Sequence, residues 1–82
     1  MDKMKALREQ IDILDDQLMF LLSKRYDISS KIGEYKSNSN IEILDNNREQ
    51  LIINKTLNHS HSPQLELVYR AIMDASKNIQ GK

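Results

Sequence analysis

Residues 7–36, LREQIDILDDQLMFLLSKRYDISSKIGEYK, decide the fold. Through this stretch and the residues just before it, apolar side chains recur at steps of three and four. The series is Met4, Leu7, Ile11, Leu14, Leu18, Leu21, Ile28, Ile32 and Tyr35. Its single gap falls at Arg25, and no proline interrupts it. The spacing predicts one long helix over about residues 2–37, weakest at Gly33.

A second, shorter helix is expected after the segment SNSNIEIL, residues 37–44, whose small polar residues indicate a loop. Asp45 or Asn46 can cap this helix, and the pair Asn46 and Glu49 has the spacing of a capping box. The apolar side of the helix runs to about residue 58. We therefore expect the second helix over about residues 45–58.

The third helix is expected over about residues 63–80, with Ser62 as its cap and Pro63 at its first position. With 2 Gly and 1 Pro in 82 residues, the chain has few turn formers. The sequence thus predicts an all-α fold, a single domain over residues 1–82 with three helices.

The length of the first helix predicts a partner. About 35 helical residues span roughly 50 Å, whereas a compact chain of this size has a diameter of roughly 30 Å. The two shorter helices cannot cover all of the apolar stripe along the first. We therefore expect a homodimer that pairs the two long helices.

Composition narrows the class of protein. The 12 basic and 12 acidic residues balance, so no overall charge favours nucleic acid or an anionic membrane. There is no cysteine, and His59 and His61 lack a third ligand at a fixed spacing, so no metal site is predicted. The start, MDKMKALREQ, lacks the apolar run of a signal peptide, and we expect a cytoplasmic protein that does not enter the membrane.

Arg25 needs an anionic partner, because an unpaired buried guanidinium costs several kcal/mol. A carboxylate of the chain, such as Asp12, Asp15 or Glu49, is one candidate. A ligand is the other. Lys36 follows Arg25 by eleven residues, about 20° around the helix and roughly 16 Å along it, so the two cations could close on one small dianion.

Arg8 cannot join them from the same helix. It lies about 25 Å from Arg25 along the axis and about 100° around it. In an antiparallel dimer the Arg8 of one chain could approach the Arg25 of the other. Alternatively, Arg8 could pair with Asp12 one turn away.

Polar residues on the other two helices add candidates. Capping and the helix dipole explain Asp45 and Glu49, but Arg48 is unfavourable in a first turn and suggests another role. Ser76 interrupts the apolar stripe of the third helix, and Gln80 shares its face.

Four segments, LREQIDILDDQLMFLLSKR, IGEYK, ILDNNREQ and YRAIMDASKNIQ, together resemble the all-helical, type II chorismate mutase family. The resemblance covers nearly the whole chain. It implies a three-helix protomer that intertwines with a second copy as a homodimer. It also implies an isomerase of the shikimate pathway that converts chorismate to prephenate for phenylalanine and tyrosine synthesis, without a cofactor.

The resemblance also implies roles for individual residues, with the backbone near Ile32 lining the pocket. Residues that would bind substrate carboxylates are Arg25, Arg48, Ser76 and, from the partner subunit, Arg8. Residues that would donate hydrogen bonds to the ether oxygen are Lys36 and Gln80. Residues that would orient the ring hydroxyl are Glu49 and, beside it, Asp45.

The chemistry explains why such residues are enough. A concerted [3,3] rearrangement needs no nucleophile or metal, only a held conformer and stabilised charge on the ether oxygen. Two alternatives remain: a related enzyme that eliminates pyruvate from isochorismate, and a non-catalytic helical dimer or regulatory module.

Overall fold

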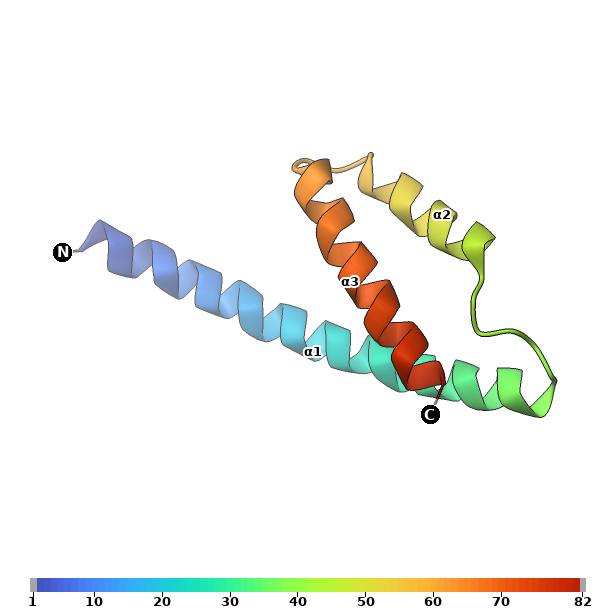
Figure 1. Cartoon of the computed structure of the whole chain (residues 1–82). Coiled ribbons are helices and arrows are strands. Elements are labelled where there is room, and N and C mark those ends of the chain that lie inside the picture. Colours follow the sequence, from blue (N-terminus) through green and yellow to red (C-terminus); the bar gives the residue numbers. More distant parts are fainter. Residues whose placement is uncertain (1, 82) are drawn as a thin grey trace.

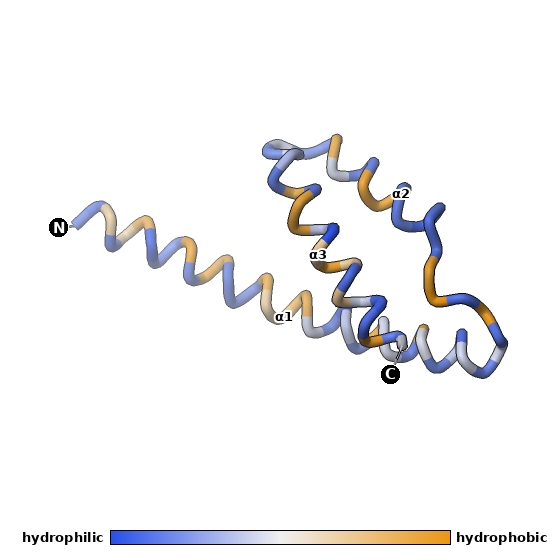
Figure 2. The backbone as a smooth tube through the Cα atoms, viewed as in Figure 1, coloured by the Kyte–Doolittle hydropathy of each residue, from blue (hydrophilic) through white to orange (hydrophobic). Residues whose placement is uncertain are grey.

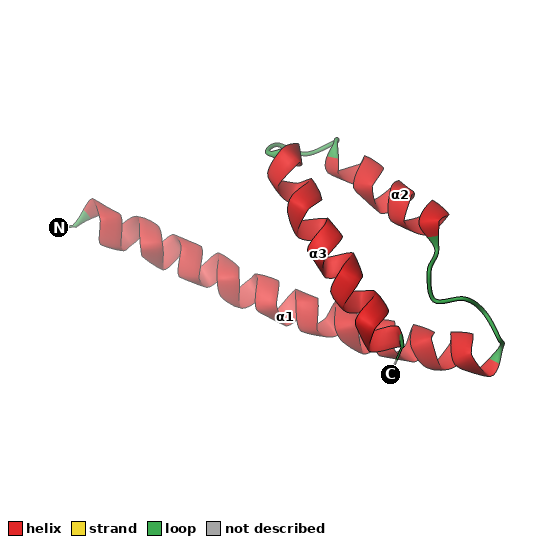
Figure 3. Ribbon diagram, viewed as in Figure 1, coloured by secondary structure: helices red, strands yellow, loops and turns green. Residues whose placement is uncertain are grey.

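The computed structural model describes residues 2–81, one residue short of the expected domain at each end. Three helices follow one another: α1 (Lys3–Asn38), α2 (Asn46–Thr56) and α3 (Ser62–Gln80). No strand occurs within the described residues (Figure 3). The expected all-α fold with one very long first helix is therefore confirmed.

Helix α1 begins and ends at local signals. The side chain of Asp2 caps its start by accepting a hydrogen bond of 2.9 Å from the backbone N–H of Met4. At the other end, Asn40 adopts a left-handed conformation with φ 56°. The N–H of Ile41 then donates to the carbonyl of Lys36 at 2.8 Å. Asparagine tolerates this conformation better than most residues, so it can end a helix where no glycine is available.

Helix α2 is capped by Asp45, whose Oδ1 accepts a hydrogen bond of 3.0 Å from the N–H of Arg48. Asn46 is therefore the first residue inside the helix, and the capping box expected between Asn46 and Glu49 is not formed. The reason is that a box needs its first residue at the cap, and Asp45 takes that place. The helix ends at Thr56, two residues before the expected end near residue 58.

Helix α3 starts one residue earlier than expected, and the prediction that Ser62 caps it is wrong. The carbonyl of His61 accepts from the N–H of Leu65 at 3.0 Å, which brings Ser62 into the helix. His61 takes the cap position in a left-handed conformation, φ 60°, and makes no side-chain cap. Pro63 lies in the first turn, where its missing N–H costs nothing.

The chain has the form of a long rod with a hairpin of two helices at one end (Figure 1). Helix α3 contacts both α1 and α2. The described chain measures 58 × 24 × 14 Å along its principal axes, which is far from spherical. Among residues 2–81 the buried apolar side chains are few: Ile53, Ile72 and Met73. The first belongs to α2 and the other two to α3, and α3 is the helix that contacts both of the others.

The first half of α1 stands free of the other helices (Figure 1). Apolar residues recur along it as separate orange turns in Figure 2. The side chains of its apolar series remain between 44% and 62% exposed: Met4, Leu7, Ile11, Leu14, Leu18 and Leu21. Helices α2 and α3 thus leave this stripe uncovered, as the length argument predicts. Among the described residues, no helix is both long and apolar enough to cross a membrane.

Candidate functional site

A cavity of about 320 Å³ lies between the second half of α1, the start of α2 and the end of α3. We call it the polar cavity. Seven of the eight residues predicted for the site line it, and so does Ile32. They are Arg25, Lys36, Asp45, Arg48, Glu49, Ser76 and Gln80. The polar interruptions of three separate helices therefore converge on one place.

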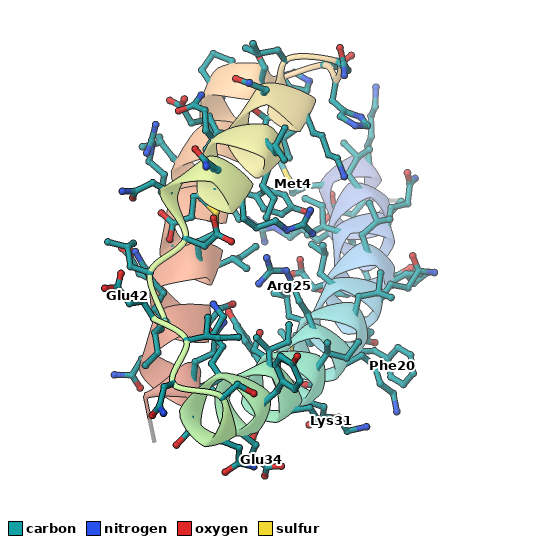
Figure 4. All side chains as sticks on the ribbon, turned by 90° about the vertical axis from the view of Figure 1, so that its right-hand side faces the viewer. Met4, Phe20, Arg25, Lys31, Glu34 and Glu42 are labelled. Carbon is teal, nitrogen blue, oxygen red and sulfur yellow. The ribbon has the colours of Figure 1, made fainter. Side chains whose placement is uncertain are left out.

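Arg25 lies in the middle of this arrangement. Its side chain points from α1 into the space between α1 and the other two helices (Figure 4). The guanidinium Nη1 donates to the hydroxyl oxygen of Ser76 at 2.5 Å, and that hydroxyl donates in turn to the carbonyl of Ile72 at 2.8 Å. Within residues 2–81, Arg25 forms no ion pair with a carboxylate. Its charge is therefore held by a neutral partner and remains uncompensated.

Lys36 ties the end of α1 to the loop that follows it. Its ammonium donates to the backbone carbonyl of Ile43 at 2.9 Å. An ammonium has three donors, so this contact leaves two N–H groups for a ligand. The loop in this way sets the direction of the Lys36 side chain at the rim of the polar cavity.

Gln80 reaches the same cavity because α3 approaches α1 very closely. Gly33 is buried at the crossing, and a Cβ on it would lie 2.6 Å from both Cα and the carbonyl oxygen of Gln80. The Oε1 of Gln80 is buried and has no hydrogen-bond partner among the described residues. Amide oxygen and nitrogen can exchange places by rotation, so this end of the side chain can either donate or accept.

Two carboxylates lie at the start of α2. Asp45 uses Oδ1 for its cap, which leaves its second oxygen for a ligand. Glu49 pairs with Lys77 of α3, with 3.1 Å between Oε2 and Nζ. The hydrogen bond to Glu49 raises the pKa of Lys77 above its ordinary value. Lys77 also lines the polar cavity.

Lys77 was not predicted from the sequence. The available signal was its place three residues before Gln80 and four after Met73, which puts all three on one side of α3. Taken alone, an exposed-looking lysine beside Ser76 is unremarkable. Its pairing with Glu49 of α2 distinguishes it. The sequence pattern of one helix does not predict a contact with another helix.

The polar cavity carries a surplus of positive charge. Its cations are Arg25, Lys36, Arg48 and Lys77, and its carboxylates are Asp45 and Glu49. The formal excess is two positive charges in a chain whose net charge is zero. Such a site suits a small molecule with two negative charges.

Arg8 does not belong to this cavity. It lies on the free half of α1 and is exposed. Because α1 is one continuous helix, Arg8 and Arg25 of the same chain lie about 25 Å apart along its axis. A contribution from Arg8 requires a second chain, and it stays a prediction.

His59 and His61 lie in the turn between α2 and α3. No group of three His, Cys, Asp or Glu side chains within residues 2–81 is arranged to hold a metal ion.

Known proteins resemble this chain in sequence. The family model for chorismate mutase type II matches residues 7–81. A bifunctional chorismate mutase/prephenate dehydratase from Aquifex aeolicus (strain VF5) is 34% identical over 90 aligned residues, which cover all of this chain. The chain spans about a quarter of that relative, 25% of its length.

A solved structure gives the same result for the fold. A conserved hypothetical protein from Pyrococcus furiosus superimposes with a TM-score of 0.85 at 30% identity. The match covers 98% of this chain and 97% of the other. The Pyrococcus furiosus chain therefore has the same fold over nearly its whole length.

Proposed function

Because the chain belongs to the chorismate mutase type II family, we propose that it is an isomerase that converts chorismate to prephenate. In this [3,3] rearrangement the C–O bond of the enol ether breaks while a C–C bond forms at the ring. Electrons move in one cycle, and no proton or group leaves the molecule. The enzyme's task is to hold a chair-like conformer and to stabilise the charge that develops on the ether oxygen.

One observation carries this proposal: the polar cavity has an excess of two positive charges, and chorismate is a dianion. The match is local, since the chain as a whole is neutral. A volume of about 320 Å³ is at the lower end of the usual range for small-molecule sites. Charge and size together favour a compact dicarboxylate.

Arg25 is the residue that we assign to one substrate carboxylate. Ser76 already accepts from one of its nitrogen atoms, and this bond holds the planar guanidinium while its other N–H groups face the ligand. Arg48 would add positive charge from the α2 side. In this proposal the substrate is the anion that the sequence predicts for Arg25.

Lys36 and Gln80 are the residues that we assign to the ether oxygen. They approach the polar cavity from α1 and α3. The unpartnered amide end of Gln80 supports this role, because buried polar groups nearly always have a partner. Donors fixed before the reaction cost no reorganisation when charge develops.

Glu49 is the residue that we assign to the ring hydroxyl, which would donate to its carboxylate. Asp45 lies beside it and would contribute its free oxygen or, through the cap, the placement of the first turn of α2. A carboxylate that binds the hydroxyl favours the conformer in which the two ends of the molecule approach each other.

The assay compares prephenate formation by the wild type with Arg25→Ala and Lys36→Ala. We expect kcat/KM to fall by about 10² or more in each variant, the usual loss for a fixed donor in a water-excluded site. Arg70→Ala and Lys31→Ala are matched controls. Arg70 pairs with Glu66 on an exposed face, and Lys31 points outward from α1 (Figure 4).

Activity unchanged in both Arg25→Ala and Lys36→Ala would disprove the site. Complete lack of turnover by the wild type would instead favour a non-catalytic helical dimer. Products should be identified by chromatography and NMR with both chorismate and isochorismate. Release of pyruvate from isochorismate, without prephenate from chorismate, would favour the lyase.

We further propose that the active form is a homodimer joined along the exposed stripe of α1. Fully burying a large apolar side chain contributes about 1.5–3 kcal/mol, and six such side chains are half-exposed in the free half of α1. An antiparallel pairing would bring the Arg8 of one chain to the polar cavity of the other.

Subunit exchange tests this arrangement. Arg8→Ala and Arg25→Ala dimers are each expected to be nearly inactive. In their mixture, each heterodimer would contain one site with both arginines intact and one site with neither, so partial activity should return. No recovery after exchange has been verified by mass would show that Arg8 does not act in trans.

A further inference from the structure

Lys77 of α3 lines the polar cavity and pairs with α2, yet the functional assignment above gives it only a share of the positive charge and no specific role. Its Nζ lies 3.1 Å from Oε2 of Glu49 and 3.4 Å from Oδ1 of Asp74. The two bonds differ in their surroundings. Glu49 is 27% exposed and lines the cavity, whereas Asp74 is 77% exposed and faces outward.

The contact with Glu49 is a link between helices. Glu49 lies in the first turn of α2 and Lys77 in the last turn of α3. Each residue suits its own helix end electrostatically, so both would be tolerated without the other. The bond between them adds a fixed direction for the Glu49 carboxylate at the wall of the cavity.

A carboxylate at the wall of a cavity for a dianion is unfavourable by itself, and the pairing of Glu49 with Lys77 offsets this. A bare Glu49 next to a dianionic ligand would repel it, and its flexible side chain would have several rotamers. The ammonium of Lys77 offsets the charge and occupies one oxygen, which leaves Oε1 as the acceptor. The pKa of Lys77 is raised, mainly by the hydrogen bond to Glu49, so the ammonium is charged throughout the neutral range.

We infer that Lys77 is a positioning residue, which holds the Glu49 carboxylate for the ring hydroxyl of the substrate and lets it lie beside a dianion. This inference rests on the proposed function. It makes Lys77 act through Glu49 rather than through direct contact with the reacting atoms. The consequence is a strict dependence: Lys77 matters only when position 49 is a carboxylate.

The test is a double-mutant cycle with Lys77→Met, Glu49→Gln and the combined variant, each assayed for prephenate formation. We expect Lys77→Met to lower kcat/KM by about tenfold in the wild type, with a raised KM and a lowered kcat. In the Glu49→Gln background the same substitution should change kcat/KM by less than about threefold. Lys77→Arg, which keeps the charge and the donors, should restore most of the activity.

Two controls separate positioning from folding. Asp74→Asn removes the other partner of Lys77 and should leave activity within about twofold of the wild type. Thermal unfolding of every variant shows whether a loss of activity follows a loss of structure. A general loss of structure in Lys77→Met would reduce activity equally in both backgrounds.

Equal losses in the two backgrounds, or unchanged activity of Lys77→Met, would overturn the inference while leaving the proposed function intact. Should Lys77→Met fail to fold, Lys77→Gln takes its place in the same cycle. A wild type that makes no prephenate overturns the proposed function first, and this inference with it.

Discussion

Gly33→Ala is expected to reduce activity far more than stability. The new methyl group would lie 2.6 Å from Cα and from the carbonyl oxygen of Gln80, and 3.0 Å from its carbonyl carbon. These are backbone atoms, which cannot rotate away. Carbon atoms in ordinary contact are about 3.5–4.0 Å apart, so α3 must move from α1 by about 1 Å at its C-terminal end.

The effect on stability is small because two contributions oppose each other. Alanine is more favourable than glycine inside a helix by about 1 kcal/mol. Overpacking at a close crossing costs about 1–3 kcal/mol. The net loss is about 1 kcal/mol, which lowers Tm by about 4–8 °C in a chain of this size.

The effect on the reaction is larger, since Gln80 moves with the backbone to which it is attached. A displacement of 1 Å of a group that must meet the transition state can cost about 10²-fold in rate. We expect kcat of Gly33→Ala to fall by about this factor while the variant stays folded. The assay is steady-state prephenate formation, with circular dichroism melting on the same samples.

The second glycine provides the matched control. A Cβ at Gly81 would meet its nearest atoms at 3.6 Å, an ordinary contact. Gly81→Ala should therefore leave kcat within about twofold and Tm within a few degrees. Full activity in Gly33→Ala, with an unchanged Tm, would refute the argument that the close crossing places Gln80.

Three further predictions follow from the contacts described. Ser76→Ala removes the partner of Arg25, so KM should rise by about tenfold in steady-state assays; an unchanged KM would contradict the role given to this bond. Asp45→Ala removes a helix cap and should destabilise the chain by about 1 kcal/mol, measured by urea unfolding with Asn46→Ala as control. The pKa of Lys77 is raised above 10.5, so the stabilisation by its ammonium should be lost only at high pH. The Tm difference between wild type and Lys77→Met should therefore stay constant from neutral pH to about pH 10 and shrink above it. A difference that shrinks below pH 9 would contradict a raised pKa.

The long helix was predictable because its information is local. Steps of three and four residues over more than thirty positions describe one element without reference to any other. The polar residues Arg25 and Ser76 stood out for the same reason, since each interrupts an apolar series. The structure shows that these two interruptions meet, which explains why both are tolerated.

The contacts between helices could not be predicted from such patterns. The pairing of Glu49 with Lys77 depends on how α2 lies against α3. Gly33 is similar: in the sequence it weakens α1, whereas in the structure it admits the backbone of Gln80. Competition between neighbours explains why the expected capping box did not form in α2, because Asp45 and Asn46 are both good caps and Asp45 takes the place.

The uncovered stripe along α1 has a consequence for how this chain reaches its folded form. A helix of some eighteen residues without tertiary support is only marginally stable in water, so its order must come from whatever covers its apolar side. If a second copy does so, folding and association become a single bimolecular event. Refolding would then speed up as protein is added, and the unfolding midpoint would rise with concentration. A melting temperature of this chain would have meaning only together with the concentration at which it was measured.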